Sequence, residues 1–163
     1  LTNKMKKGFT LIEMAVVLLV IGFLAGIVLR NIGGQTELAR DTRRLGDLRN
    51  TSNYLSTYLA KFGYFPNASS WSALETELRN RSIVDRLPRD PSGRDYDYYY
   101  CSDSGSVANQ SNINHFILRA QLEQTQTSAP RLWETSLTSV PTGWTCNTTP
   151  ICDPNQRYYC TAQ

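Results

Sequence analysis

An apolar segment near the start of the chain constrains the fold more than any other feature. Residues 9–29 contain only two polar side chains, Thr10 and Glu13. About 20 apolar residues suffice to cross a bilayer as a helix, whereas a cleaved secretory signal has a shorter core that ends in a small-residue site. The segment continues to Arg30 without such a site. We therefore expect a retained membrane helix over residues 9–30.

Three lysines precede this segment, namely Lys4, Lys6 and Lys7. Positive charge in front of an apolar span holds that end in the cytoplasm, so the chain after the span is expected to be exported. Once residues 1–8 are set aside, the chain has 14 basic and 14 acidic side chains. The positive balance belongs to the leader and does not indicate nucleic-acid binding.

Glu13 is unusual because a charge at the centre of a bilayer costs roughly 2.5–3.5 kcal/mol. Such a residue usually has a partner. Directly before it, the sequence KKGFTLIE places two lysines, a glycine, an aromatic residue and the acid at fixed offsets, followed by the apolar run. This stretch resembles the processing site of type IV pilins and the related pseudopilins.

The resemblance implies that a prepilin peptidase cuts between Gly8 and Phe9 and methylates the new amine of Phe9. That amine is mostly protonated at neutral pH. Glu13 lies four residues further on, about one helical turn away. Glu13 can neutralise that amine within one subunit or between neighbouring subunits. In the family the pairing is between subunits, and two charges that are unfavourable alone in apolar packing become tolerable together.

The same resemblance implies an α+β, type IV pilin-like fold. A long N-terminal helix is expected to pack against a small antiparallel β-sheet domain with a disulfide-stabilised C-terminal region. The expected organisation is a cleaved leader at 1–8, a transmembrane and filament-core half of the helix at 9–30, its amphipathic half at 31–62, and a globular head at 63–163.

Glycines stand near both ends of the second half of the expected long helix. Gly33 and Gly34 are expected to form a hinge because glycine costs about 1 kcal/mol relative to alanine inside a helix. Gly63 is the expected C-cap. Between them runs an apolar stripe at helical spacing, formed by Leu38, Leu45, Leu48, Leu55, Leu59 and Phe62. The charged residues around the stripe are interpreted as a solvated or subunit-facing surface; they are Arg40, Asp41, Arg43, Arg44, Asp47 and Arg49.

The sequence patterns over the expected head, residues 63–163, are weaker than those of the helix. Ser72 and Glu75 have the spacing of a capping box, which predicts a short helix over 72–80. Alternation from Asp95 to Cys101 and over 115–122 predicts an antiparallel hairpin.

A third strand is expected within 131–144, and the tail from 141 to 163 is expected to be a loop region. The stretch RDPSGRDYDYY, residues 89–99, resembles the Asp-Pro-x-Gly-x-x-Tyr-x-Tyr turn and strand of major pseudopilins and related pilins.

The four cysteines lie far from the apolar segment, at positions Cys101, Cys146, Cys152 and Cys160. An even number in an exported domain favours two disulfides, with three possible pairings. We favour Cys101 with Cys146 and Cys152 with Cys160. Zinc is disfavoured because the chain has no C-x-x-C and only one histidine, His115.

No nucleotide-binding, zinc-protease or hydrolase motif is present, so we expect neither catalysis nor a cofactor. A calcium ion held by loop aspartates is the alternative considered; the candidates are Asp90, Asp95, Asp97, Asp103 and Asp153. They lack EF-hand spacing. The alternating tyrosines from Tyr96 to Tyr100 are interpreted as sheet packing.

The sequence therefore predicts a structural subunit of a bacterial type IV pilus-like filament. The resemblance implies a homopolymer whose helices form the filament core, with a prepilin peptidase, an inner-membrane platform protein and an assembly ATPase as partners. It implies residence in the inner membrane before assembly into a surface pilus. The alternatives are a pseudopilin of a type II secretion system and, in another class, an anchored exported binding or enzymatic domain that does not polymerise.

Overall fold

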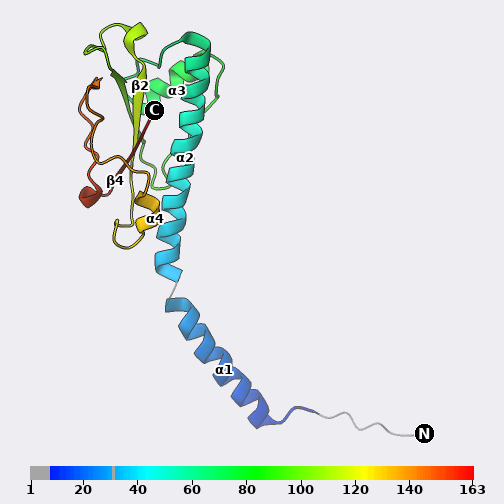
Figure 1. Ribbon diagram of the computed structural model, residues 1–163. Helices are drawn as coiled ribbons and strands as arrows, with labels where there is room; N and C mark the ends of the chain where they lie inside the picture. Colours follow the sequence, from blue (N-terminus) through cyan, green and yellow to red (C-terminus); the bar gives the residue numbers. More distant parts are fainter. Residues whose placement is uncertain (1–7, 31) are drawn as a thin grey trace. The chain divides into compact units, whose positions relative to one another are not determined.

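The computed structural model describes residues 8–30 and 32–163, without the side chains of residues 28–34. The expected leader lysines fall among residues 1–7, outside the described residues. The chain divides into two compact units, residues 1–36 and 37–163. Figure 1 shows the two long helices, the strands and the smaller helices in chain order. Each unit is described by itself.

The long N-terminal region contains two described helices, α1 (Leu11–Arg30) and α2 (Ile32–Phe62). Asn31, between them, lies outside the described residues. None of the helices in the described part of the chain combines the length and the apolar character needed to span a bilayer. The membrane span expected over residues 9–30 stays a prediction.

Helix α2 ends where the sequence predicts. Gly63 adopts a φ of +80°, a left-handed conformation that glycine reaches without steric cost, and its N–H donates to the Leu59 carbonyl at 2.7 Å. The apolar stripe faces the head: Leu45, Leu48 and Leu55 are buried. Leu38, at the other end of the stripe, is exposed.

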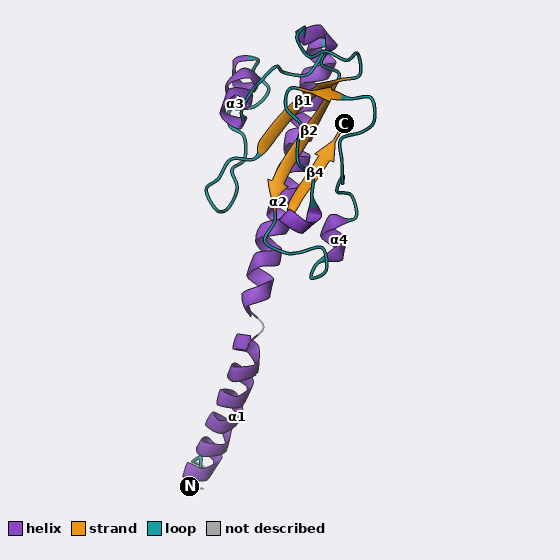
Figure 2. Cartoon of the chain, turned by 90° about the vertical axis from the view of Figure 1, so that its left-hand side faces the viewer, coloured by secondary structure: helices purple, strands orange, loops and turns teal. Residues whose placement is uncertain are grey.

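Four antiparallel strands form one sheet in the order β3-β1-β2-β4. Figure 2 shows the three longer strands lying across one face of α2. The strands are β1 (Asp97–Ser102), β2 (His115–Gln121), β3 (Thr145–Cys146) and β4 (Tyr158–Ala162). The expected hairpin is confirmed, since β1 pairs with β2 in a register that sets Tyr99 opposite Ile117.

Two expectations for the C-terminal third are wrong. Residues 131–144 contain no strand. A short helix, α4 (Pro130–Trp133), overlaps the start of this range, since Pro130 suits the first helical turn and Trp133 is buried. The tail is not only a loop region, since it supplies β3 and β4. Strand β4 does not show the period-two pattern, because its consecutive residues Tyr159 and Cys160 are both buried.

Helix α3 (Trp71–Asn80) covers the core with Trp71, Leu74 and Leu78, which share one helical face. The predicted capping box is wrong. Ser70 is the N-cap, and its Oγ accepts from the Ala73 N–H at 3.1 Å. The helix therefore begins at Trp71, one residue earlier than predicted, and the Trp71 side chain is buried.

Short 3₁₀ turns η1 (Gln110–Asn112) and η2 (Pro154–Gln156) complete the elements. The main core lies between α2, α3 and the sheet, and it includes Leu48, Leu55, Tyr58, Phe65, Trp71, Leu74, Leu78, Phe116 and Leu118. Tyr96 and Tyr98 are buried in it, which agrees with the interpretation of the tyrosines as sheet packing.

Candidate assembly site

The start of α1 carries a reciprocal pair of hydrogen bonds between Thr10 and Glu13. The Thr10 N–H and hydroxyl both donate to the Glu13 carboxylate at 3.3 Å, and the Glu13 N–H donates to the Thr10 hydroxyl at 3.3 Å. This is a capping box, in which Glu13 satisfies backbone groups that the helix leaves free. The Thr-x-x-Glu spacing was visible in the sequence, but Glu13 was interpreted only as a partner for an amine.

The predicted cleavage point is open to solvent. A Cβ placed on Gly8 would meet no atom within 4 Å, and Phe9 is 81% exposed. In the intact chain the nitrogen of Phe9 is part of a peptide bond. Cleavage after Gly8, methylation of Phe9 and the pairing of its amine with Glu13 therefore stay predictions.

Helix α1 and Phe9, which precedes it, present apolar side chains to solvent over residues 9–27. Exposed members of this set are Phe9, Leu11, Ile12, Met14, Val16, Val17, Leu18, Leu19, Val20, Ile21, Phe23, Leu24 and Ile27. An apolar surface of this extent marks a membrane or protein interaction site, because soluble monomers rarely leave one uncovered. Gly33 and Gly34 fall within the bounds of α2, and their role as a hinge stays a prediction.

The charged residues of α2 do not all form a solvated surface, and for Asp41 and Arg44 that expectation is wrong. Both side chains are completely buried. The Arg44 guanidinium bonds to Asp41 at 2.6 Å, to Asp90 at 2.6 Å and to Glu123 at 2.8 Å. Three carboxylates thus surround one buried cation, and this cluster ties α2 to two loops of the head.

The cluster is held in its charged state by mutual pairing. Burial acts to lower the pKa of Arg44, but its hydrogen bonds to the three carboxylates outweigh burial and raise it. Burial acts to raise the pKa of Asp90, yet hydrogen bonds from Arg44 and Ser92 hold it below the ordinary value. A hydrogen bond from Arg40, opposed by burial and aided by Arg44, lowers the pKa of Glu123 to about 2.

One signal for this cluster was present in the sequence. Asp90 lies in the Asp-Pro-x-Gly stretch, and the expected turn forms there: the Gly93 N–H donates to the Asp90 carbonyl at 2.8 Å, with a φ of +82° at Gly93. The partner Arg44 lies 46 residues earlier. Only the fold brings the two together.

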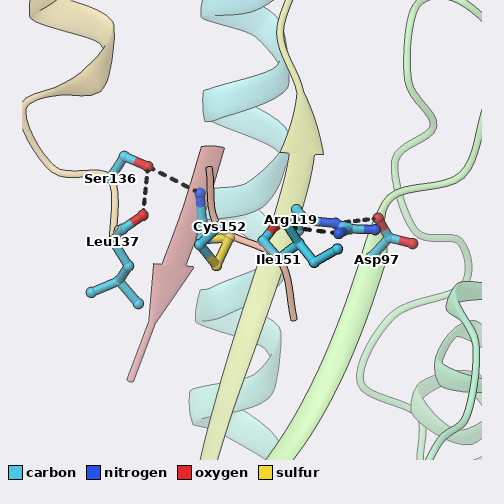
Figure 3. Close-up of a disulfide and its surroundings, with 7 residues drawn as sticks. Asp97, Arg119, Ser136, Leu137, Ile151 and Cys152 are labelled. Atoms are coloured by element: carbon cyan, nitrogen blue, oxygen red, sulfur yellow. Dashed lines mark hydrogen bonds and ion pairs between the residues drawn. A yellow bond between two sulfur atoms is a disulfide. The ribbon is translucent and has the colours of Figure 1, made fainter. Parts of the chain in front are cut away.

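Two disulfides close the C-terminal region, Cys101–Cys146 and Cys152–Cys160. These are the two pairs favoured from the sequence. The first joins β1 to β3, where Cys101 and Cys146 face each other in register. The second anchors the loop before η2 to β4. Figure 3 shows Arg119 on the neighbouring strand between Asp97 and the backbone of Ile151.

The aspartates considered for calcium are engaged with different groups. Asp90 binds Arg44, Asp95 binds Arg89 at 2.8 Å, and Asp97 binds Arg119 at 2.9 Å. Among the described residues, no group of three or more histidine, cysteine, aspartate or glutamate side chains is placed to hold a metal ion. His115 stacks on Trp144, with ring centroids 3.8 Å apart.

Comparison with known proteins places these features in a family. The prokaryotic N-terminal methylation motif matches residues 3–29. The type II secretion system core protein G of Vibrio cholerae is 33% identical over 116 residues, which cover 64% of this chain and 80% of that protein. The protein of the same name from Escherichia coli is 31% identical over 101 residues, covering 56% and 70%. No solved structure matches the chain significantly.

The chain belongs to the family of type II secretion system core protein G. A further relative, from Klebsiella pneumoniae, is 30% identical over 112 residues and 80% of its own length is covered. The resemblance to type IV pilins and pseudopilins is thus confirmed, as is the α+β pilin-like fold. Of the functions left open by the sequence, the relatives support the secretion pseudopilin, which lies within the broader pilin class.

Two of the features described above lie within the matched motif. The methylation motif contains the Thr10–Glu13 capping box and most of the apolar surface of α1.

Proposed function

We propose that this chain is a structural, non-catalytic subunit of the pseudopilus of a bacterial type II secretion system. The observation that carries the proposal is its similarity to core protein G over 80% of the Vibrio cholerae protein. The methylation motif over residues 3–29 supports it independently of the head.

The subunit is first inserted in the inner membrane. The apolar segment inserts with the leader lysines on the cytoplasmic side, and the head is exported to the periplasm. Two disulfides in the head suit this oxidising compartment. A prepilin peptidase then removes residues 1–8 and methylates Phe9.

Assembly buries the apolar surface of α1 against other copies. In the intact chain the Glu13 carboxylate is bound to Thr10. After cleavage a stronger partner exists, because the methylated amine of Phe9 carries a full positive charge. Pairing of Glu13 with the amine of a neighbouring subunit neutralises both charges in the apolar filament core and sets the axial register. An inner-membrane platform protein and an assembly ATPase complete the proposed set of partners, without a cofactor.

Mass spectrometry of the mature protein tests the processing step. N-methylated Phe9 is the expected first residue in cells with an active prepilin peptidase, and a strain lacking the peptidase should retain the leader as a control. An intact leader in both strains would contradict the proposal. Electron microscopy then separates the two kinds of filament, since the proposal expects short periplasmic filaments and long surface filaments would indicate a pilus.

A further inference from the structure

The outer edge of the sheet at β1 is only partly covered. Strand β1 pairs with β2 over Asp97–Cys101, whereas β3 pairs with Cys101 and Ser102 at its end. One more residue continues this contact: Asn147 donates its N–H to the Tyr100 carbonyl at 3.0 Å and accepts from the Tyr100 N–H through its side-chain oxygen at 3.2 Å. The first half of β1 therefore has no neighbouring strand on this side in the part of the chain that the structure describes.

The register shows which backbone groups face this open edge. Residues of an antiparallel pair alternate between directing their N–H and C=O groups at the partner strand and directing them away from it. Tyr100 directs both groups away from β2, since both bond to Asn147. Its opposite residue Phe116 likewise bonds to Gln163 on the other side of the ladder. Tyr98 lies two residues before Tyr100, so its N–H and C=O also point to the open edge.

Tyr96 and Tyr98 leave four backbone groups without a partner beside this edge. Their rings are buried in the core, where the hydroxyls donate to the Asp47 carboxylate and to the Pro66 carbonyl, each at 2.8 Å. Within residues 37–163, all of which are described, the backbone N–H and C=O groups of Tyr96 and Tyr98 form no hydrogen bond with another residue. Unpaired backbone groups are costly to bury, so this edge suits a ligand that pairs with them.

These groups border a groove of about 330 Å³ beside β1. Ser69, Ser70 and Trp71 line it from the start of α3, and Asn147 and Thr148 line it after β3. Figure 2 shows α3 next to β1, on the side of that strand away from β2. An extended peptide is the ligand that suits an unpaired strand edge in a groove, because it adds to the sheet as a new strand and pairs through its main chain.

The charge of the groove indicates the kind of peptide that fits. Its charged lining side chains are Asp95 and Asp97, which are 44% and 48% exposed. Each already binds one arginine, Arg89 or Arg119, but a carboxylate can accept about four hydrogen bonds and so has capacity for another cation. Residues two positions apart share one face of an extended chain. A peptide with basic side chains at alternate positions therefore matches the groove.

The same two acids disfavour the β1 strand of a second copy as the occupant. Edge-to-edge pairing through this stretch would bring Asp95 and Asp97 of one chain against the same acids of the other. Like charges opposite each other on paired strands are destabilising, and charged side chains at a sheet edge are a common protection against self-pairing. The edge is thus closed to its own kind and open to a strand of opposite charge.

We propose that the open edge of β1 is a docking site for an extended, basic segment of another protein. The segment forms main-chain hydrogen bonds with Tyr96 and Tyr98, and it places lysine or arginine side chains beside Asp95 and Asp97. It extends the row of the sheet that β3 begins. This site goes beyond the proposed filament role, because it lies wholly within the head and requires no contact with α1.

Binding of short peptides to the full chain in detergent micelles tests the site. The probe is acetyl-Lys-Thr-Lys-Thr-Lys-amide, and nuclear magnetic resonance of the chain with isotope-labelled tyrosine follows the Tyr98 N–H. We expect this peptide to shift the Tyr98 amide signal and to slow its hydrogen exchange at least about tenfold, because the N–H becomes paired. Two comparison peptides should do neither: one has glutamate for lysine, and the other keeps the lysines but carries N-methyl groups on both threonines.

The N-methylated peptide separates strand pairing from simple charge attraction. Threonines of a docked peptide face Tyr96 and Tyr98 and supply the main-chain donors, whereas the lysines face the two acids. An equal response to the N-methylated peptide, or no response to the lysine peptide, would overturn the docking site. Protection of the Tyr98 N–H that rises with protein concentration in the absence of peptide would assign the edge to a second copy and would also overturn it.

Two pairs of variants locate the bound peptide. Thr148→Trp fills the groove from an exposed position and should abolish the response, whereas Thr149→Trp adds the same ring outside the groove lining and should keep it. Asp95→Asn should weaken binding about threefold, and Asp103→Asn, at a position 60% exposed beyond the end of β1, should leave it unchanged.

A response that survives Thr148→Trp would place the peptide elsewhere and overturn the proposal. The peptide comparison uses the unaltered chain, so it decides the proposal even if a variant fails to fold. Each of these negative results leaves the proposed filament function standing, because that function is tested by the processing of Phe9 and by filament formation.

Discussion

The Nε of Arg44 on α2 donates a 2.6 Å hydrogen bond to the carboxylate of Asp90 in the Asp-Pro-x-Gly turn. The Arg44 side chain is completely buried and that of Asp90 is 5% exposed. This pair, with Asp41 and Glu123, connects α2 to two loops of the head.

Replacing Arg44 tests how much stability this cluster provides. Arg44→Met keeps most of the side-chain volume but removes the cation from the buried Asp41 and Asp90 carboxylates, while Glu123 keeps Arg40 as a partner. Removing one partner from a buried ionic group costs about 3–5 kcal/mol, so we expect a loss of this size in the free energy of unfolding. Urea unfolding measures it. Arg43→Met is the control, since Arg43 is 67% exposed and its loss should cost less than about 0.5 kcal/mol.

The cluster also predicts a dependence of stability on acid. The folded-state pKa of Glu123 is about 2, below its ordinary value of 4.5. A depressed acid pKa gives stability that is complete above the unfolded value and is lost as pH falls through the folded one. We therefore expect the unfolding temperature to fall between about pH 4.5 and 2, with Asp90 acting in the same direction.

Glu123→Gln should flatten part of this acid loss while lowering stability at pH 7. Glu134→Gln, at an exposed position, should leave the slope unchanged. An identical slope in the Glu123 variant and the parent would show that the loss of stability in acid arises elsewhere.

The N-cap of α3 offers a prediction with its control two residues away. Ser70→Ala removes the oxygen that accepts from the Ala73 N–H and should cost about 1 kcal/mol of stability. Ser72→Ala should cost little, because Glu75 accepts from the Leu87 N–H and does not pair back to a cap at Ser72. Thermal unfolding of the two variants distinguishes them, and a greater loss from Ser72→Ala would restore the capping box expected from the sequence.

Local patterns in the sequence predicted those parts of the fold that depend on neighbouring residues. The end of α2 at Gly63 and the β1–β2 hairpin follow from glycine conformation and period-two alternation. Strand β4 was missed because its residues pack against β2 and a disulfide, which suppresses the alternation.

The burial of Arg44 could not be predicted for a different reason. A charged residue on an amphipathic helix is normally solvated, and its partners Asp90 and Glu123 lie 46 and 79 positions further along the chain. By contrast, the methylation motif could be recognised from the sequence because its signals are contiguous from Lys6 to Glu13.

The two disulfides should contribute unequally to stability. In the chain-entropy account the stabilisation grows with the length of the closed loop, and the separations here are 45 and 8 residues. Replacing Cys101 and Cys146 by alanine should cost about 4 kcal/mol, against about 2.5 kcal/mol for Cys152 and Cys160. Urea unfolding of the two double variants measures the difference. The reverse order would mean that strain or residual structure outweighs loop entropy.

Three substitutions separate the two roles of the first turn of α1. Thr10→Val removes the hydroxyl from the capping box and should weaken the helix start by about 1 kcal/mol, but it leaves the Glu13 charge in place. Glu13→Gln keeps an acceptor for the Thr10 N–H and removes the charge. Glu13→Ala removes both. All three should be exported and processed.

If the carboxylate pairs with the amine of a neighbour, Thr10→Val should still assemble, whereas Glu13→Gln should fail as fully as Glu13→Ala. The readouts are the amount of chain recovered in sedimented filaments and the N-terminal mass of the mature protein. Normal filaments from Glu13→Gln combined with failure of Thr10→Val would assign the acid to helix capping instead. Because only the charge differs appreciably between glutamate and glutamine, this comparison decides which partner of Glu13 matters for assembly.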